Sequence, residues 1–597
     1  MRFGTEINGD RVHFRLWAPY QPAVSLVLTG SGRVSPMNPT ADGWHGLELP
    51  GASPGTLYRF RLSDGLEIPD PASRFQPDDV HGPSEVIDPR AHAWQDAAWR
   101  GRPWEEAVLY ELHVGAFTRE GTFRAAIEKL PALVALGVTA IQMMPVGGFP
   151  GRQSWGYDGV HLFAPDQSYG RPEDLKALVD AAHGRGLMVI LDVVYNHFGP
   201  VGNYWPLCGP IFTERHETPW GAAVNFDGSG SPTVRELVIE NALFWIDEYH
   251  VDGLRLDAVH AMVDDSPVHI LDELAHRVRA VRRNRPVHLV LENEANQSSR
   301  LGRSANGVPL AYTAQWNDDL HHVLHTAVTG EGDSYYRSYV GDRDKLGRAL
   351  AEGFAFQGET MPHTGGARGE ASAMLPPTAF IGFIQNHDQI GNRAFGERLT
   401  AIAPAEAVRA VAAICLLSPQ IPMLFMGEEW GASTPFLFFC DLGPELAPAV
   451  REGRQREFAR FPAFEDPAIR AAIPDPSAAS TLEASKLRWE EAETGEHARW
   501  RALYGDLIAL RQREIVPRLR GIGMHAGTHG LEGNVVRVAW TLGDGTVLTL
   551  AANLTPEPEP LPAAVRDGRL LWCEGTVTGG RLGPWTALFR LLDGEKP

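Results

Sequence analysis

The segment Met188–His197, MVILDVVYNH, is an apolar run that ends in a polar cluster. An apolar run of about five residues is typical of a strand buried on both faces, as in a parallel sheet covered by helices. Similar runs recur through the middle of the chain and alternate with segments whose apolar residues have helical spacing. The strands expected from this pattern are residues 108–113, 138–143, 188–192, 253–257, 287–291, 311–315, 380–385 and 421–425.

A helix is expected between the first two of these strands. Apolar residues from Phe123 to Val134 recur at helical spacing and Gly137 suits a C-terminal end, whereas Pro131 predicts a kink. Eight strands with intervening helices over roughly 400 residues favour a (β/α)8 barrel over a doubly wound sheet. We therefore predict an α/β fold in which a TIM barrel with loop insertions covers residues 91–520.

Short alternating strands are expected on both sides of the barrel. Those before it are residues 12–17, 23–28, 44–49 and 57–62. Gly and Pro clusters separate them, which predicts an N-terminal β-sandwich over residues 1–90, of the kind found in carbohydrate-binding modules. Residues 69–84, PDPASRFQPDDVHGPS, are rich in Pro and Asp and are expected to form an ordered connector. Strands at 534–542 and 546–552 predict a small C-terminal β domain over residues 521–597.

The composition excludes several classes of function. The 597 residues include 54 Lys and Arg against 74 Asp and Glu, a net charge of -20, which disfavours nucleic acids and anionic membranes as partners. The chain has no Gly-Lys pair, so the phosphate-binding loop of nucleotide hydrolases is absent. Its four cysteines lack C-x-x-C spacing, which indicates neither a zinc site nor a disulfide framework. Since the start lacks a signal-peptide pattern and no apolar stretch is long enough to span a bilayer, we expect a cytoplasmic protein.

Polar clusters lie at the ends of four of the expected strands. They are residues 192–197 (DVVYNH), 253–260 (GLRLDAVH), Glu292, and 386–393 (NHDQIGNR). Barrel enzymes carry their chemistry at the carboxyl ends of the strands. We therefore expect these clusters to meet in one site, although a single Asp or Glu at a strand end is more often a helix cap or an ion-pair partner.

Two carboxylates of this set have the features of a glycosidase pair. Side chains alternate along a strand, so Arg255 and Asp257 share one face and Arg255 can hold Asp257 ionised, as a nucleophile at a sugar C1 carbon requires. Glu292 ends the neighbouring strand and would be the acid, with a pKa raised by burial and by the nearby anion. Retaining glycosidases hold such a pair about 5 Å apart. Glu294 is the alternative acid, and we favour Glu292 because it directly follows the apolar run.

Further residues are suited to binding a sugar. Asp388 supplies a third carboxylate, for hydroxyl groups and for an oxocarbenium-like transition state. His197 and His387 can donate hydrogen bonds to hydroxyls, and Tyr157 offers an aromatic face to the apolar side of a ring.

The pattern does not indicate a metal centre. His321 and His325 have the helical spacing of a metal pair, but no third ligand is evident. We interpret both as structural or substrate-wall residues and predict neither a metal nor another cofactor.

Together these motifs resemble those of the α-amylase family of glycoside hydrolases, over nearly the whole chain. The resemblance implies that Asp257 is the nucleophile, Glu292 the general acid/base and Asp388 the transition-state stabiliser. The residues that it implies around a bound glucose are Tyr157, His197, Arg255 and His387. Asp192 and Asn196 match mainly structural positions of the family.

Other runs narrow the resemblance within that family. FRLWAP and PDPASR are similar to the group that contains branching, debranching and trehalose-releasing enzymes. YELHVGAFTREGTF, QWNDDLHH, NHDQIGNRAFGERL and MLFMGEEWGASTPFLFF are most similar to the trehalose-releasing members. The implied reaction is hydrolysis of the α-1,4 bond next to the trehalose end of a maltooligosyltrehalose, which yields trehalose and a maltooligosaccharide. A maltooligosyltrehalose synthase, which makes the substrate, is the implied pathway partner.

Residues on the acceptor side of the cleft would have to distinguish trehalose from maltose. The aromatic residues proposed as its walls are Trp205, Trp220, Phe226, Phe395 and Trp430.

Two alternative functions stay open. A glucan branching enzyme would use the same three carboxylates and transfer the glycosyl group to a sugar hydroxyl instead of water. A non-catalytic glycan-binding protein would have lost a catalytic carboxylate, and none is missing.

Overall fold

The eight predicted strands form a closed parallel barrel in the computed structural model, which describes residues 1–281 and 283–594. In barrel order they are β10 (Leu109–Leu112), β11 (Ala140–Met143), β14 (Met188–Val193), β17 (Gly253–Leu256), β18 (His288–Leu291), β19 (Ala314–Trp316), β20 (Phe380–Gly382) and β21 (Ile421–Phe425). β21 pairs with β10 and so closes the barrel. The predicted (β/α)8 fold is confirmed, with the sixth and seventh strands shorter than expected.

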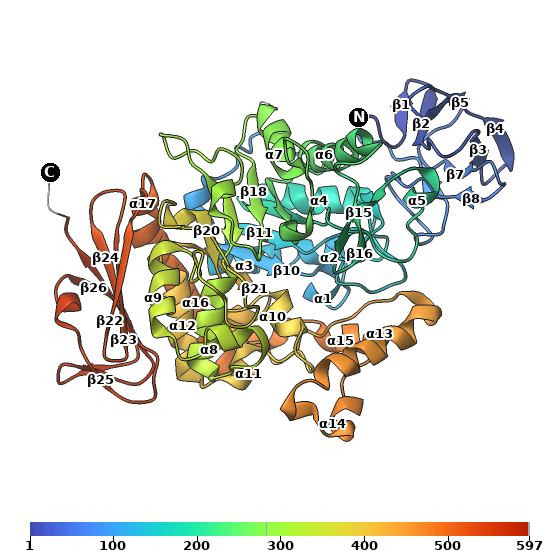
Figure 1. The fold of residues 1–597 in the computed structure, drawn as a ribbon. Coiled ribbons are helices and arrows are strands. Elements are labelled where there is room, and N and C mark those ends of the chain that lie inside the picture. Colours follow the sequence, from blue (N-terminus) through green and yellow to red (C-terminus); the bar gives the residue numbers. More distant parts are fainter. Residues whose placement is uncertain (282, 595–597) are drawn as a thin grey trace.

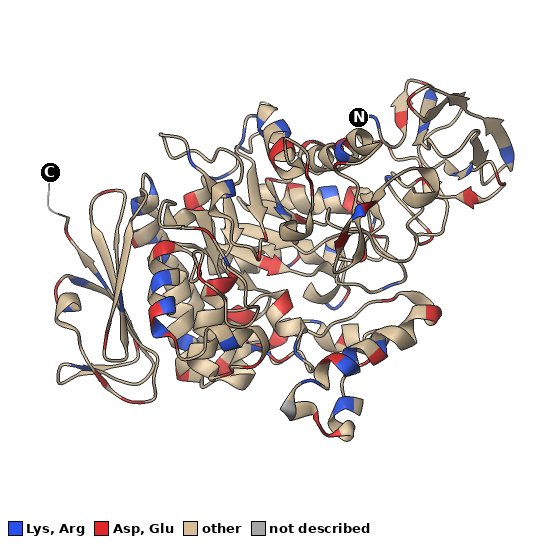
Figure 2. Ribbon diagram, viewed as in Figure 1, with Lys and Arg blue, Asp and Glu red and all other residues tan. Residues whose placement is uncertain are grey.

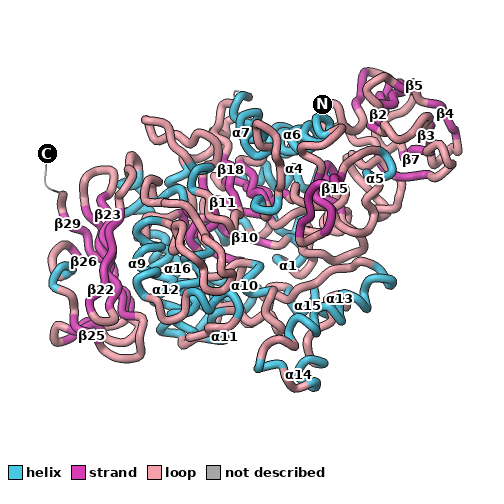
Figure 3. Tube along the Cα trace, viewed as in Figure 1, coloured by secondary structure: helices cyan, strands magenta, loops and turns pink. Residues whose placement is uncertain are grey.

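Helices surround the barrel. The longer ones are α4 (Pro172–His183), α6 (Ser231–Glu248), α7 (Ile270–Ala280), α8 (Asp318–Thr329), α9 (Arg343–Glu352), α12 (Ala405–Leu417) and α16 (Gly495–Leu510). Figure 3 shows α9, α12 and α16 grouped between the barrel and the C-terminal strands. α12 is buried along almost its whole length, because it packs against α16 on one side and strand β29 (Thr586–Leu592) on another.

The kinked helix expected before β11 is in fact two helices. α2 (Phe123–Ile127) ends before α3 (Leu130–Leu136) begins. Pro131 lies in the first turn of α3, where a missing N–H group breaks no helical hydrogen bond. Gly137 ends α3 in the left-handed conformation with φ 99°, as its position predicted.

The N-terminal unit is a β-sandwich. One sheet has the order β1 (Glu6–Asn8), β2 (Arg11–Trp17), β6 (Trp44–Pro50), β5 (Asn38–Pro39). The other has β4 (Arg33–Pro36), β3 (Ser25–Leu28), β7 (Leu57–Arg61), β8 (Glu67–Ile68), with β9 (Ser84–Glu85) also paired to β7. Inward residues such as Val12, Phe14 and Phe60 form a core of their own. The connector is ordered as predicted, since Asp70 accepts a 2.7 Å hydrogen bond from the Tyr58 hydroxyl.

The C-terminal unit is a five-stranded antiparallel sheet. Its order is β22 (Gly527–Glu532), β23 (Val535–Thr541), β24 (Val547–Asn553), β29, β26 (Arg569–Glu574). A small sheet of β25 (Glu559–Pro560), β28 (Arg581–Leu582) and β27 (Val577–Thr578) adjoins it. Trp540 donates a 3.0 Å hydrogen bond to the carbonyl of Leu350 in α9, which fastens the sheet to the barrel helices. The two β units lie at opposite ends of the molecule with the barrel between them (Figure 1).

Two insertions in the loops at the carboxyl ends of strands extend the barrel. The hairpin of β15 (Phe212–Thr218) and β16 (Gly221–Val224) follows β14. The helices α13 (Gly443–Phe458), α14 (Pro467–Ala471) and α15 (Ala479–Ser485) follow β21 and project from the barrel (Figure 1). Acidic and basic residues are interspersed along the ribbon of the barrel and of both β units (Figure 2).

Candidate functional site

The four polar clusters meet at one end of the barrel. Asp192 belongs to β14, Asp257 and Glu292 follow β17 and β18, and Asp388 lies in α10 (His387–Gly391) after β20. A cleft of about 950 Å³ opens there, and Asp257, Glu292 and Asp388 all line it. The sequence prediction that these residues share one site is therefore confirmed.

Arg255 is the centre of the site. It is fully buried in β17, where its Nη1 lies 2.6 Å from Asp192 Oδ2 and 2.9 Å from Asp257 Oδ1. Its Nη2 lies 2.6 Å from Glu292 Oε2. The guanidinium carbon stands 4.1 Å from the ring centre of Trp316 in β19, so a flat aromatic surface supports it. One cation thus fixes three carboxylates, and the predicted contact with Asp257 is present.

Asp257 is oriented from two sides. Arg255 donates to Oδ1, while Asn196 Nδ2 donates to Oδ2 at 2.8 Å and to the backbone carbonyl of Asp257 at 2.9 Å. The next residue, Ala258, is left-handed with φ 39° and ψ 48°, a conformation that L-residues other than glycine rarely adopt. This turn directs the N–H of Ala258 onto Glu292 Oε2 at 2.8 Å. Backbone strain at this point therefore serves to hold the acidic pair.

Glu292 is placed beside Asp257 by strand register. Leu256 pairs with Leu291, so the residues that follow them are neighbours across β17 and β18. Burial raises the pKa of Glu292, and the charge of Asp257 raises it further against the opposing effect of Arg255. Glu294, the alternative acid, has a side chain 67% exposed and stands 3.8 Å from His260. The geometry therefore favours Glu292 over Glu294.

Asp388 and His387 approach from the other side of the barrel. The side chain of Asp388 is 38% exposed and lines the cleft, and burial together with Glu292 raises its pKa. His387 Nδ1 lies 2.6 Å from Oε1 of Glu111, a fully buried residue of β10. Burial opposes a charge on His387, but Asp388 and Glu111 together raise its pKa to about 9. His387 is therefore a cation at neutral pH.

Tyr157 and His197 also line the cleft. The Tyr157 hydroxyl donates a 2.8 Å hydrogen bond to Asp192 Oδ2, and its ring lies nearly parallel to that of His387 with centres 5.2 Å apart. His197 Nε2 is 3.0 Å from the Tyr157 carbonyl, and its Nδ1 contacts the side chain of Asn196. Both ring nitrogens of His197 thus have partners within the protein, and burial lowers its pKa to about 4.

Most of the aromatic residues predicted to form walls of the cleft do not line it, so that prediction was mostly wrong. Trp205, Phe226 and Trp430 are buried in the core, and Phe395 lines a different cavity. Only Trp220, at the tip of the β15–β16 hairpin, lines the cleft, with its ring stacked 4.9 Å above that of His197. Trp155 and Phe438 also line the cleft and were not foreseen.

Two acidic residues of the site were missed in the sequence. Glu111 was overlooked although a Glu inside an otherwise apolar strand, YELHV, was a usable signal. Asp318, the first residue of α8, stands near Glu292 and Asp388; burial and the charge of Glu292 raise its pKa to about 8. Asp192, by contrast, was expected to be structural, and burial together with Asp257 raises its pKa to about 7.

The histidines with helical spacing have structural contacts. His321 contacts the Ile384 carbonyl at 2.8 Å and the Tyr336 hydroxyl at 2.9 Å, and His325 contacts Glu331 at 2.8 Å. They are not substrate-wall residues, since neither lines the cleft.

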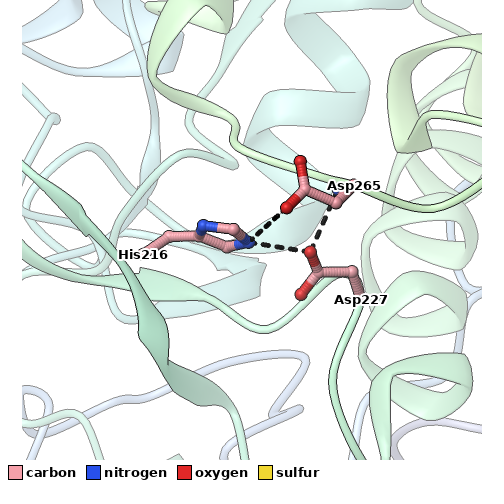
Figure 4. Close-up of side chains that lie close together, drawn as sticks. All are labelled: His216, Asp227 and Asp265. Carbon is pink, nitrogen blue, oxygen red and sulfur yellow. Dashed lines mark hydrogen bonds and ion pairs between the residues drawn. The ribbon is translucent and has the colours of Figure 1, made fainter.

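A separate cluster of His216, Asp227 and Asp265 joins the β15–β16 hairpin to the barrel (Figure 4). His216 Nε2 is 2.7 Å from Asp227 Oδ2 and 3.7 Å from Asp265 Oδ2. Arg215 Nη1 lies 3.2 Å from Asp227 Oδ1, and its Nη2 lies 3.8 Å from Asp265 Oδ2. Because Arg215 and His216 both pair with these two carboxylates, the cluster serves as an ion-paired support for the hairpin that carries Trp220.

Comparison with known proteins identifies the family of this chain. Residues 59–206 match the model described as "Alpha amylase, catalytic domain", and residues 526–589 match a domain of unknown function, DUF3459. The crystal structure of a Salmonella typhimurium protein superposes on this chain with a TM-score of 0.94. The two sequences are 46% identical, and the match covers 99% of each chain. A glucan branching enzyme from Pseudoalteromonas atlantica is 29% identical over 55% of this chain and 50% of its own length.

Longer matches have one name in common. The malto-oligosyltrehalose trehalohydrolase of Deinococcus radiodurans is 44% identical over 90% of this chain and 87% of its own length. Those of Saccharolobus solfataricus and Arthrobacter ramosus are 43% and 40% identical, over 82% and 97% of this chain and 84% and 99% of theirs. The chain therefore belongs to the malto-oligosyltrehalose trehalohydrolases, within the α-amylase family of glycoside hydrolases.

Proposed function

We propose that this protein is a retaining glycoside hydrolase that cleaves the α-1,4 bond next to the trehalose end of maltooligosyltrehalose. The products are trehalose and a maltooligosaccharide. The activity named for the relatives supports the substrate. The observation that carries the chemistry is the single guanidinium of Arg255, which holds Asp257 on one nitrogen and Glu292 on the other.

The proposed reaction has two steps. Asp257 attacks C1 of the glucosyl unit while Glu292 gives its proton to the leaving oxygen of trehalose. Glu292 then removes a proton from water, and this water releases the maltooligosaccharide from Asp257. Arg255 and Asn196 support the role of Asp257, because their hydrogen bonds hold one carboxylate oxygen each and so fix its orientation. The raised pKa of Glu292 supports its role as the acid.

Retention of configuration is supported by the spacing of the pair. An inverting enzyme needs room for a water between its carboxyl groups, which are then about 6.5–9.5 Å apart. Asp257 and Glu292 are instead held by the two Nη atoms of one side chain and follow directly paired residues of adjacent strands. This arrangement suits direct attack on the sugar and a covalent intermediate.

The remaining residues are proposed to bind the glucosyl unit. Asp388 accepts hydrogen bonds from its hydroxyls and stabilises the positive charge of the transition state. His387 donates to a hydroxyl as an imidazolium, supported by its raised pKa. Tyr157 presents its ring to the apolar side of the sugar, Arg255 orients the carboxylates, and His197 fixes the Tyr157 carbonyl.

The test is product analysis with two substrates, maltopentaosyltrehalose and a plain maltooligosaccharide of matched length. Rapid release of trehalose from the first, with slow cleavage of the second, supports the proposal. Equal cleavage of both would indicate a general amylase. Longer branched products without free trehalose would indicate a branching enzyme, which the limited match to such enzymes disfavours. Absence of any cleavage would indicate a non-catalytic glycan-binding protein, although all three carboxylates are in place.

We further propose that the chain is divided into three domains, at residues 1–90, 91–520 and 521–597. The separate core of the sandwich and the end of the last barrel helix, α17 (Val516–Leu519), support this division.

Among the described residues, no helix combines the length and apolar character needed to cross a membrane. A cytoplasmic location is proposed from the four cysteines, all of which are free. A maltooligosyltrehalose synthase is the proposed pathway partner.

A further inference from the structure

Glu111 is a buried carboxylate that has no role of its own in the proposed reaction. It lies two residues after Leu109 in β10, and Leu109 packs with residues of the other barrel strands, so the side chain of Glu111 also points into the barrel. Glu111 is fully buried and is not among the residues that line the cleft. Any contribution of Glu111 to the reaction must therefore pass through the residue that it binds.

That residue is His387, which Glu111 binds at two points. Oε1 of Glu111 lies 2.6 Å from the ring nitrogen Nδ1, and Oε2 accepts a 3.1 Å hydrogen bond from the backbone N–H of His387. Within residues 1–281 and 283–594, His387 is the ion-pair partner of Glu111. One carboxylate thus fixes both the ring and the main chain of a residue that lines the cleft.

The surrounding oxygen atoms decide which protons the His387 ring carries. Nδ1 faces Glu111 Oε1, and the other ring nitrogen, Nε2, lies 3.5 Å from Asp388 Oδ1. An ionised carboxylate can only accept hydrogen bonds, so each ring nitrogen needs a proton of its own. The geometry therefore favours an imidazolium. The raised pKa of His387, about 9, agrees: burial opposes the charge, whereas Asp388 and Glu111 favour it.

We propose that Glu111 is a positioning residue for the glycosidase reaction, which holds His387 as an imidazolium beside Asp388 and so keeps Asp388 ionised next to the bound glucosyl unit. This inference rests on the proposed function and deepens it. Burial raises the pKa of Asp388, and the positive charge of His387 opposes that rise. An ionised Asp388 can accept hydrogen bonds from sugar hydroxyls and stabilise the positive charge of the transition state.

A purely structural role for Glu111 explains less. A buried ion pair often contributes no more to stability than apolar residues of similar volume, because both charges lose their hydration. The ring of His387 is also packed without Glu111, since it lies nearly parallel to Tyr157 at 5.2 Å and meets Trp155 edge-on at 5.5 Å. These aromatic contacts hold the plane of the ring. They provide no hydrogen-bond acceptor that would place a proton on Nδ1.

Other titratable groups around His387 have pKa values away from its own. The groups that face it or act on it come from β10, the loop after β11, β14, β17 and α10, and they are Glu111, His113, Tyr157, Asp192, Arg255 and Asp388. Burial lowers the pKa of His113 to about 4, raises that of Asp192 to about 7 and raises that of Tyr157 well above its usual range. Between the last two values, loss of a proton from His387 is the ionisation that we expect.

The test is the pH dependence of kcat/KM for α-maltosyl fluoride, measured in a Glu292→Gln background with and without Glu111→Gln. Fluoride leaves without a proton and the glutamine removes the ionisation of the general acid, so the alkaline limb reports on His387. Activity should fall as the pH rises through about 9, where the imidazolium loses its charge. Glu111→Gln should move this limb down by at least about one pH unit, because a neutral amide no longer favours the cation.

Glu429→Gln in the same background is the matched control. Glu429 is also a buried carboxylate beside β10, where the Tyr110 hydroxyl donates a 3.1 Å hydrogen bond to it, and it does not line the cleft. The alkaline limb should stay where it is in the parent. A loss of thermal stability in Glu111→Gln without a shift of the limb would show a structural role and contradict the proposal.

A double-mutant cycle tests whether Glu111 acts through His387. In the otherwise wild-type enzyme, Glu111→Gln should lower kcat/KM for maltopentaosyltrehalose about tenfold near neutral pH, as expected for a weakened charged hydrogen bond. When His387 is already replaced by glutamine, the same substitution should change kcat/KM by less than about twofold. An equal loss in both backgrounds would show that Glu111 acts by another route.

The wild type provides an independent measurement if Glu111→Gln fails to fold. In NMR spectra of isotope-labelled histidine, the signals of His387 are identified by their absence from His387→Gln. Both ring nitrogens should carry a proton at about pH 8, one unit below the pKa of this group. A neutral His387 ring at that pH overturns the inference.

The experiments separate this inference from the proposed function. A wild-type enzyme that releases no trehalose from maltopentaosyltrehalose overturns the proposed function and the inference with it. The inference alone is overturned if the wild type releases trehalose but Glu111→Gln leaves the alkaline limb in place and kcat/KM within about twofold of wild type.

Discussion

Glu292→Gln is the most informative single substitution in the catalytic pair. Both hydrogen bonds to Glu292, from Arg255 Nη2 at 2.6 Å and from the Ala258 N–H at 2.8 Å, reach the same oxygen, Oε2. A glutamine can place its carbonyl oxygen there, so both donors keep an acceptor. The substitution therefore removes only the charge contribution to one hydrogen bond. The free energy of unfolding should fall by about 1 kcal/mol.

The kinetic effect of this substitution should be far larger. Removal of a general acid costs roughly 10²–10⁴-fold in rate, and Glu292 is proposed to act in both steps. Hydrolysis of maltopentaosyltrehalose should therefore fall at least about a thousandfold. α-Maltosyl fluoride has a leaving group that needs no proton, so a pre-steady-state burst of fluoride should persist within about tenfold of the wild-type rate.

The pH profile gives a second measure of the same residue. Burial and Asp257 raise the pKa of Glu292, and the acid must be protonated to act, so wild-type kcat/KM should fall as the pH rises through that pKa. The glutamine variant should lack this falling limb. Glu294→Gln is the matched control, since its exposed side chain lies two residues on. An equal loss on both substrates, or a similar loss in the control, would refute the assignment.

Three further substitutions test the surrounding structure. Asp257→Ala should lower kcat/KM more than about a thousandfold with an unchanged circular dichroism spectrum, and higher residual activity would rule it out as the nucleophile. Ala258→Gly should raise the free energy of unfolding by about 1 kcal/mol in denaturant titrations, because it relieves a φ of 39°; a decrease would show that this turn is not strained. Arg255→Lys should lower it by about 3 kcal/mol, because one ammonium cannot bridge Asp257 and Glu292 as two Nη atoms do; a loss below about 1 kcal/mol would contradict the central role of this side chain.

Much of the architecture could be read from local patterns. All eight barrel strands were predicted because strands buried on both faces are mostly apolar, and this property is visible in about five consecutive residues. The four principal strands of the sandwich were found in the same way from their alternation and turns. The helix with Pro131 was misjudged, because a proline can kink a helix or start a new one and the local pattern is the same.

The site was predictable where its residues follow strands. Asp257, Glu292 and Asp388 could be assigned to one end of the barrel because parallel strands bring their carboxyl ends together. The aromatic walls were not predictable in this way. Trp205 and Trp220 lie in the same insertion and look alike in the sequence, yet one is fully buried and the other is 49% exposed.

The sequence by itself determined the order of the elements and the chemical groups at their ends, because side-chain periodicity and turn residues act between near neighbours. Only the tertiary structure decided how those groups are paired. Glu111 reaches His387 across 276 residues of sequence, and Arg255 gathers Asp192, Asp257 and Glu292 from three strands. Such contacts depend on closure of the barrel, which brings β10 beside β21 and turns distant strand ends toward one axis. Burial, and with it the pKa of Glu292 and Asp318, follows from that closure as well.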